Sequence, residues 1–243
     1  MRVKLVSFTP EPLKVAAYVK KIIEGKHVEL SSISDEEAEL EFIDTLKSSI
    51  LSPFEFINFV FDFQDVPRAF THQHVRTRSA VYMQESLRFS TREEGKFKFE
   101  TGPTIEFNEN AKRLFNSAME EIGRKYWELI QMGVATEDAR GVLPINILTG
   151  IAQGINYRSL IATAEQRLCL QSQPFHRKVF LEIKAILTKE VHPLIGKYLA
   201  PSCSHNGFCS WGGRLDRPCP LQKIYPMKPA PFDFILREGD IVK

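Results

Sequence analysis

The segment 71–90, THQHVRTRSAVYMQESLRFS, places three arginines, two glutamines and three serines between apolar runs. Arg76, Arg78 and Arg88 fall within thirteen residues, and buried cations at this density need several anions to pair with them. Guanidinium groups bind phosphate bidentately, and side-chain amides suit base edges. The alternative is a helix and strand whose arginines pair with surface carboxylates. The cluster favours a site for a nucleotide-sized anion.

The overall charge and hydropathy narrow the class of protein. The net charge of +2 gives no global basic field for a nucleic-acid polymer. No apolar run approaches the roughly 18–20 residues that span a bilayer. The start, MRVKLVSFTPEPLK, lacks the apolar core of a signal peptide. We therefore expect a cytoplasmic protein with neither a membrane nor a nucleic acid as partner.

Apolar periodicity divides the chain into helices and strands. Strands are predicted at 3–8 and 54–63, and an extended segment at 84–90. Helices are predicted at 12–23, 34–49, 67–76, 110–132, 157–170 and 174–190, with a short helix opening at Thr136 and closing at Pro144. Residues 91–107 are predicted to form a surface loop or lid.

The chain contains no internal repeat and no convincing linker, so we expect one domain over residues 1–243. The last part, 200–243, is rich in Pro, Gly and Cys and is predicted to be a wrapping tail. We expect an α+β fold, with a mixed or antiparallel sheet flanked by helices.

Two helices begin with recognisable capping residues. Ser34 followed by Glu37 is a capping signature, and Asn156 is a plausible cap for the helix from Tyr157. At 100° per residue, Asn156, Thr163 and Arg167 share one helical face. That face is either part of a site or the satisfied edge of a core.

The cysteines near the C-terminus have the spacing C-x5-C-x9-C. Cys203, Cys209 and Cys219, with His205 among them, are possible zinc ligands. The spacing is irregular and contains no C-x2-C pair, which favours buried thiols or a disulfide, and we predict no metal site. Cys219 is a poor candidate nucleophile, because it lies in a Pro-rich segment with no histidine near it in sequence.

Arg76-Thr77-Arg78, followed after seven residues by Ser86, resembles the signature of the flavin-dependent thymidylate synthases, Arg-His-Arg, seven residues, Ser. The resemblance covers roughly residues 50–190 in order. It extends over SPFEFINFVFDF, THQHVR, ESLRFS, GVATEDARGVLPINILT and NYRSLIATAEQRLCLQSQ.

The resemblance implies the residues of two sites. The implied dUMP site consists of Gln73, Arg76, Gln84, Ser86, Leu87, Arg88, Arg140 and Arg167, with Arg140 coming from another subunit. The implied FAD site consists of Ser52, Arg76, Thr77, Arg78, Gln84, Asn156 and Arg158. Two residues would be catalytic: Arg167 would face the uracil and favour ionisation at N3, and Ser86 would orient the base rather than attack it.

The implied reaction is the reductive methylation of dUMP. NADPH would reduce FAD, methylenetetrahydrofolate would supply the one-carbon unit, and the products would be dTMP and tetrahydrofolate. Such a methyltransferase needs no cysteine nucleophile, because the cofactor performs the difficult step. The family assembles as homotetramers with shared sites, which we expect here too.

The sequence departs from the family pattern mainly on the flavin side. Thr77 replaces the signature histidine, and Phe89 replaces a tyrosine. Ile50 and Ala162 stand where polar side chains are usual, and a downstream Gln-Trp-Glu reads QPF at 173–175. The alternatives are therefore another flavin-dependent C5 modification, such as hydroxymethylation, or a nucleotide-binding homologue without flavin chemistry.

Overall fold

The structure is a computed structural model that describes residues 1–48, 50–88, 98–207, 209 and 219. The chain forms two compact units. The sheet unit contains Met1–Ser7 and Phe59–Ile155, and the helical unit contains Phe8–Asn58 and Asn156–Lys243. None of the described helices is long and apolar enough to cross a membrane.

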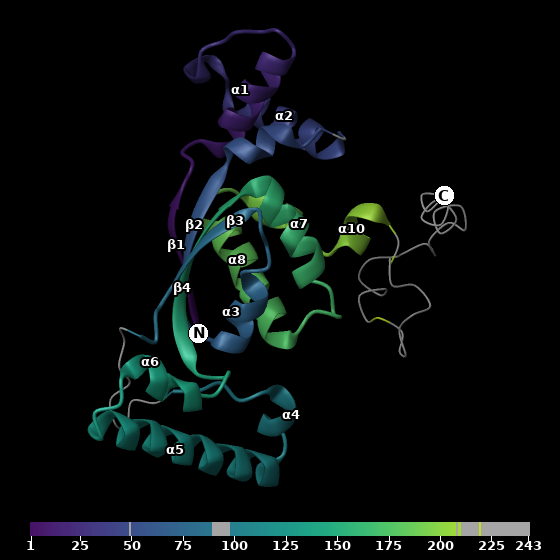
Figure 1. The fold of residues 1–243 in the computed structure, drawn as a ribbon. Coiled ribbons are helices and arrows are strands. Elements are labelled where there is room, and N and C mark those ends of the chain that lie inside the picture. Colours follow the sequence, from purple (N-terminus) through teal and green to yellow (C-terminus); the bar gives the residue numbers. More distant parts are fainter. Residues whose placement is uncertain (49, 89–97, 208, 210–218, 220–243) are drawn as a thin grey trace, which may run out of the picture. The chain divides into compact units, whose positions relative to one another are not determined.

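Four strands form one antiparallel sheet in the order β1-β2-β4-β3 (Figure 1). They are β1 (Arg2–Phe8), β2 (Asn58–Pro67), β3 (Ala80–Gln84) and β4 (Leu148–Asn156). In the β3–β4 pair, Ala80 lies opposite Ile155 and Gln84 opposite Ile151. The α+β class is confirmed, and the sheet is antiparallel rather than mixed.

One face of the sheet carries a row of buried aromatic rings. Phe59, Phe61 and Phe63 alternate along β2 and are fully buried, as the period of a strand requires. Helix α3 (Arg68–His74) packs on this row, since the Phe63 ring lies 6.1 Å from Phe70 and 5.1 Å from His74. The predicted strand at 54–63 is correct only in its second half, because Ser52–Phe56 forms a 3-10 helix, η2.

Strand β4 is not predicted from the sequence. Every second residue is buried, but the alternate positions Gly150, Ala152 and Gly154 are small rather than polar. A Cβ on Gly154 would lie 2.8 Å from Cγ2 of Val81 on β3. The close approach of the two strands therefore explains a glycine that weakens the strand signal in the sequence.

The sheet unit also contains a helical segment between β3 and β4. It comprises α4 (Pro103–Glu106), α5 (Glu109–Gln131), α6 (Thr136–Ala139) and the 3-10 helix η3 (Arg140–Val142). The predicted helix at 110–132 is confirmed, and Asn108 caps it by accepting hydrogen bonds from Asn110 and Ala111. The predicted loop 91–107 lies partly outside the described residues, and its last part is α4 rather than loop.

The helical unit contains most of the remaining elements. They are α1 (Pro12–Ile23), η1 (Leu30–Ser32), α2 (Asp35–Lys47), η2, α7 (Tyr157–Arg167), α8 (Pro174–Glu190), α9 (Pro193–Tyr198) and α10 (Ser202–Asn206). The predicted tail at 200–243 begins as α10, and most of it lies outside the described residues.

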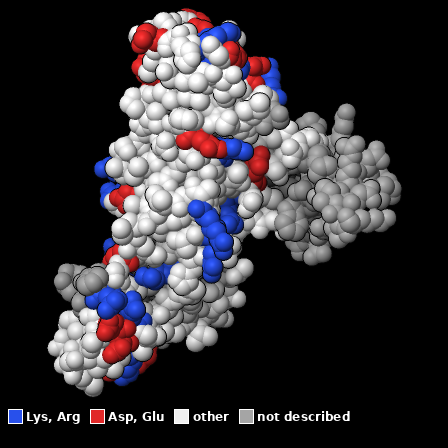
Figure 2. Space-filling model, turned by 45° about the horizontal axis from the view of Figure 1, so that its top comes forward, with Lys and Arg blue, Asp and Glu red and all other residues white. Residues whose placement is uncertain are grey.

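Ion pairs connect the first two helices. Lys20 pairs with Glu41 and Asp44, and Lys21 pairs with Glu37 at 2.6 Å. Figure 2 shows the resulting mixture of acidic and basic side chains over this part of the surface, at the top of the view. The Ser34 side chain accepts from the Glu37 N–H, so the predicted cap is confirmed.

Three rings form the centre of the helical unit. Phe54 lies 4.8 Å from Phe42 and 5.2 Å from Tyr157 between ring centroids, and all three are buried. The Tyr157 hydroxyl donates to the Ile195 carbonyl at 2.9 Å, and burial raises the pKa of this phenol well above its usual value. The ring cluster thus joins η2, α2 and α7 and ties them to α9.

Removing one ring of this cluster tests its contribution to stability. Phe54→Ala should lower the free energy of unfolding by about 3–5 kcal/mol, because a large cavity would remain. Leu40→Ala on α2 is the control, since Leu40 is 69% exposed, and it should change stability by less than about 0.5 kcal/mol. Chemical denaturation followed by circular dichroism measures both; equal effects would contradict the assignment of Phe54 to the core.

Candidate active site

The signature residues Arg76, Thr77 and Arg78 lie on a turn between α3 and β3. The turn is closed by hydrogen bonds from Arg76 N to Gln73 O and from Thr77 N to His74 O, both 3.2 Å. The Tyr82 hydroxyl lies 2.9 Å from His74 O and 3.3 Å from Thr77 O. The predicted helix through Arg76 is therefore too long, because α3 ends at His74 and the arginines follow it.

Both arginines of the signature are available for a ligand. Arg76 and Arg78 are exposed, and neither forms an ion pair or side-chain hydrogen bond within the described part of the chain. The Gln73 Oε1 atom is buried and has no hydrogen-bond partner there. Such a buried acceptor is costly. The turn therefore combines two free guanidinium groups with an amide that lacks a partner.

The predicted extended segment 84–90 is only partly extended. Gln84 is the last residue of β3, and its amide donates to Thr71 Oγ1 at 2.9 Å. Beyond it the chain turns, with Arg88 N donating to Ser86 Oγ at 3.2 Å and Leu87 buried. Phe89 and the residue after it lie outside the described residues.

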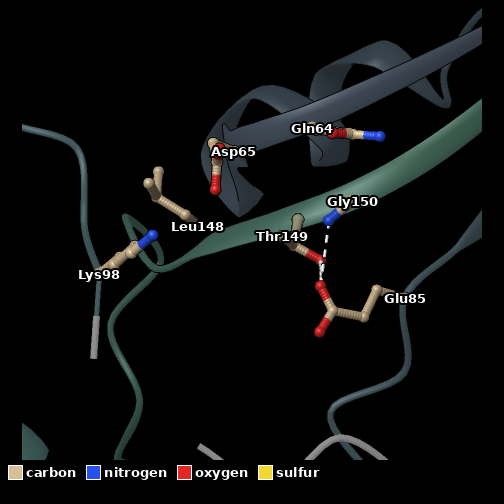
Figure 3. A pocket seen from close by; sticks show the side chains of 7 residues that line it. All are labelled: Gln64, Asp65, Glu85, Lys98, Leu148, Thr149 and Gly150. Carbon is tan, nitrogen blue, oxygen red and sulfur yellow. Dashed lines mark hydrogen bonds between the residues drawn. The ribbon is translucent and has the colours of Figure 1, made fainter. Parts of the chain in front are cut away.

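Glu85 anchors this turning segment to the sheet. Its carboxylate accepts hydrogen bonds from Thr149 Oγ1 at 3.2 Å and from Gly150 N at 3.1 Å, both on β4. Figure 3 shows this contact on one side of a cavity of about 460 Å³, which is also lined by Asp65 and Lys98. Nothing in the sequence pattern points to Glu85. Its role depends on strand β4, which the sequence pattern does not reveal.

Arg88 and Arg140 converge on one acidic residue within the sheet unit. The Arg88 guanidinium pairs with Glu137 at 2.7 Å, and Arg140 Nε donates to the Glu137 carbonyl at 3.1 Å. The side chains of Arg88 and Glu137 are about half exposed, and ion pairs of this kind are worth about 1 kcal/mol or less. An anionic ligand can therefore displace Glu137 from Arg88 at a small cost in free energy.

The remaining predicted residues belong to the helical unit. Asn156 caps α7 by accepting from Ser159 N at 2.9 Å, which confirms the predicted cap. Arg158 is exposed and pairs with Glu55 of η2, the helix that Ser52 begins. Arg167 is the last residue of α7 and is half-buried.

Thr163 lies one turn beyond Ser159 on α7. Its hydroxyl donates to the Ser159 carbonyl at 2.7 Å, so this polar group is satisfied within the helix. Asn156, Thr163 and Arg167 were predicted to share a helical face that is either part of a site or the satisfied edge of a core. Thr163 thus has the second, structural role.

Comparisons with known proteins identify the family of the chain. Residues 4–194 match the family model described as "Thymidylate synthase complementing protein". The chain is 34% identical over 212 residues to the flavin-dependent thymidylate synthase of Sulfurisphaera tokodaii, covering 84% of this chain and 79% of that protein. The chain belongs to the thymidylate synthase complementing protein family.

Two other relatives share the same name and are covered over almost their whole length. The flavin-dependent thymidylate synthase of Nitratidesulfovibrio vulgaris is 31% identical over 230 residues, which is 88% of this chain and 93% of that protein. The Clostridium tetani protein is 31% identical over 245 residues, which is 93% of this chain and 97% of that protein.

The Glu85 anchor yields a prediction for nucleotide binding. Glu85→Ala should raise the dissociation constant for dUMP about tenfold, because hydrogen bonds to a charged group contribute roughly 1.5–3 kcal/mol and Ser86 and Arg88 lose their support. Isothermal titration measures the effect.

Asp65→Asn is the matched control for Glu85→Ala. Asp65 lines the same cavity but makes no side-chain hydrogen bond within the described residues. Its φ of +53° is one that asparagine adopts readily. An equal loss of affinity in both variants would contradict the anchoring role of Glu85.

Proposed function

We propose that this chain is a flavin-dependent thymidylate synthase, a methyltransferase that converts dUMP to dTMP. Methylenetetrahydrofolate is the one-carbon donor and NADPH the reductant. Bound FAD supplies the reducing equivalents for the transfer. The observation that carries the proposal is the signature turn, where two exposed arginines adjoin a buried amide oxygen and none of these groups has a partner among the described residues.

The donor groups of the chain fit a flavin dinucleotide. Arg76 and Arg78 suit its diphosphate because guanidinium groups bind phosphate bidentately. The cap bond of Asn156 uses only Oδ1, which leaves its amide N–H₂ group to donate. We assign FAD binding to Ser52, Arg76, Thr77, Arg78, Gln84, Asn156 and Arg158. The threonine hydroxyl replaces the histidine ring of the family signature.

The proposed nucleotide site includes the second half of the arginine-rich segment 71–90, which runs from Gln84 to Arg88. Binding of dUMP is assigned to Gln73, Arg76, Gln84, Ser86, Leu87, Arg88, Arg140 and Arg167. The phosphate takes the place of Glu137 beside Arg88, since that exposed ion pair is weak. The Glu85 anchor holds Ser86 where its hydroxyl orients the base.

Arg167 is the residue assigned to polarise the uracil. A guanidinium stays protonated at any working pH, so it stabilises negative charge that develops at N3. The pyrimidine then accepts a hydride more readily at the ring. Arg167 is half-buried at the end of α7, and partial exclusion of water strengthens this electrostatic effect.

Purification followed by a product assay tests the proposal. The protein should bind FAD and form dTMP from dUMP, methylenetetrahydrofolate and NADPH. Arg167→Ala should lower kcat at least about a hundredfold while FAD stays bound, since one preorganised donor to a developing anion is worth 10²–10³ in rate. Arg124→Ala on the exposed face of α5 is the control and should keep full activity.

Three outcomes would contradict parts of this proposal. A colourless protein that takes up no added FAD would support the nucleotide-binding alternative, which Thr77 motivates. Formation of hydroxymethyl-dUMP instead of dTMP would support the related C5 modification. Unchanged turnover in Arg167→Ala would contradict the role of that residue.

We further propose that the chain acts in the cytoplasm as a homotetramer in which Arg140 completes a neighbouring site. The proposal includes one functional domain over residues 1–243. On β3, Val81 and Met83 lie on one face and are 72% and 78% exposed. Apolar side chains side by side on a strand suit contact with a second copy.

The solution mass of the full chain tests this assembly. Light scattering should give about four times the chain mass of 27.8 kDa. Met83→Asp should lower that mass, because a charge would be buried in the contact, whereas Leu40→Asp on the exposed face of α2 should not. A wild-type monomer at micromolar concentration would contradict the proposal.

A further inference from the structure

Gln153 is a buried polar residue on β4 that the assigned sites do not use. Its side chain is fully buried and makes one hydrogen bond, from Nε2 to the Tyr82 hydroxyl oxygen at 3.1 Å. The other polar atom of the amide, Oε1, is buried without a hydrogen-bond partner among the described residues. A half-satisfied buried amide is costly compared with an apolar side chain of similar size. Packing alone therefore does not explain Gln153.

The register of the sheet places Gln153 directly opposite Tyr82. The two residues are partners in the antiparallel pair of β3 and β4, so their side chains leave the same face of the sheet. Helix α3 covers this face, since the centroid of the Tyr82 ring lies 5.4 Å from that of His74, the last residue of α3. The Tyr82 hydroxyl therefore lies between β4 and the end of α3.

The directions of the hydrogen bonds follow from the atoms that surround the Tyr82 hydroxyl. His74 O lies 2.9 Å and Thr77 O 3.3 Å from it. Because carbonyl oxygens only accept, the single proton of Tyr82 points at the signature turn. The hydroxyl oxygen is then left to accept a bond, which Gln153 Nε2 donates from β4. Gln153 thus fixes the rotation of the hydroxyl group.

The signature turn benefits from this anchor because its guanidinium groups are exposed. Arg76 and Arg78 flank Thr77 and are both exposed. Binding one ligand with both side chains costs less conformational entropy when the backbone between them is already fixed. The contact with Thr77 O holds the middle residue of the signature, and the contact with His74 O holds the end of the preceding helix. One hydroxyl group therefore prepares both arginines.

We infer that Gln153 and Tyr82 are positioning residues that hold Arg76 and Arg78 in place for the diphosphate of the flavin. They act through the backbone of the turn and not through contact with the ligand. The identity of the ligand rests on the proposed function. The anchoring of the turn is a property of the chain alone, so it can be measured without any ligand.

Amide hydrogen exchange of the full chain without added flavin tests the anchor. Tyr82→Phe should raise the exchange rate of the peptide that contains Arg76, Thr77 and Arg78 about tenfold, because the turn loses this donor. Tyr198→Phe is the matched control, since it removes a tyrosine hydroxyl that donates to Leu46 O at 3.4 Å in the helical unit. It should leave exchange in the turn unchanged.

The outcome of the exchange experiment does not depend on the proposed function. Unchanged exchange in Tyr82→Phe would overturn the inference, whether or not the chain binds FAD. A wild-type chain that takes up no FAD would contradict the proposed function, and the anchor would still be decided by exchange.

FAD affinity and thermal stability, measured on the same variants, separate positioning from a merely structural role. Tyr82→Phe should raise the Kd for FAD about tenfold. It should also lower the Tm by about 5 °C, because Gln153 Nε2 becomes a buried donor without an acceptor. Gln153→Leu should raise the Kd about threefold, since the hydroxyl keeps its acceptors but is no longer fixed in rotation. An unchanged Kd in Gln153→Leu would contradict the role of Gln153.

The double variant Tyr82→Phe/Gln153→Leu gives the sharpest result. Its Tm should return to within about 2 °C of the wild-type value, because both partners are apolar and no buried donor is left. Its Kd for FAD should stay about tenfold raised, because the turn is still without its anchor. Recovery of FAD affinity together with the Tm would show a structural role only and would overturn the inference.

Discussion

The pairing of β3 with β4 is the constraint on which the candidate active site depends. Strand β3 has only five residues, and segments that carry proposed site residues leave it at both ends. The signature turn precedes Ala80, and the segment of Ser86 and Arg88 follows Gln84. The extended backbone of β3 sets the separation of the two segments, and its pairing with β4, Ala80 opposite Ile155 and Gln84 opposite Ile151, holds the strand in place. Two further contacts, from Tyr82 to the turn and from Glu85 to β4, complete this frame.

Most of the longer helices could be predicted from the sequence, because their signals are local, whereas the strands β3 and β4 were not predicted. The caps at Ser34 and Asn156 are as predicted, and α8 has the predicted bounds Pro174–Glu190. Strand β4 was missed because small residues at alternate positions hide its period. The segment after Gln84 was predicted as extended because its residues alternate, but the bond to Ser86 Oγ makes it turn.

The arginines of the candidate site could be predicted, because residue type alone indicates the ligand that they bind. Arginines between apolar runs indicate an anion site wherever the chain takes them. Glu85 and Tyr82 could not be found in the same way, since each acts through a partner distant in sequence or through a backbone carbonyl.

The central claim is that the signature turn and the segment held by Glu85 form one site for flavin and pyrimidine nucleotide together. The visible absorption spectrum of bound FAD, recorded before and after addition of dUMP, tests it most directly. The account predicts a saturable change in the flavin bands that is lost in Arg88→Ala. Flavin bands that stay unchanged while dUMP binds, as measured by calorimetry on the same sample, would contradict it.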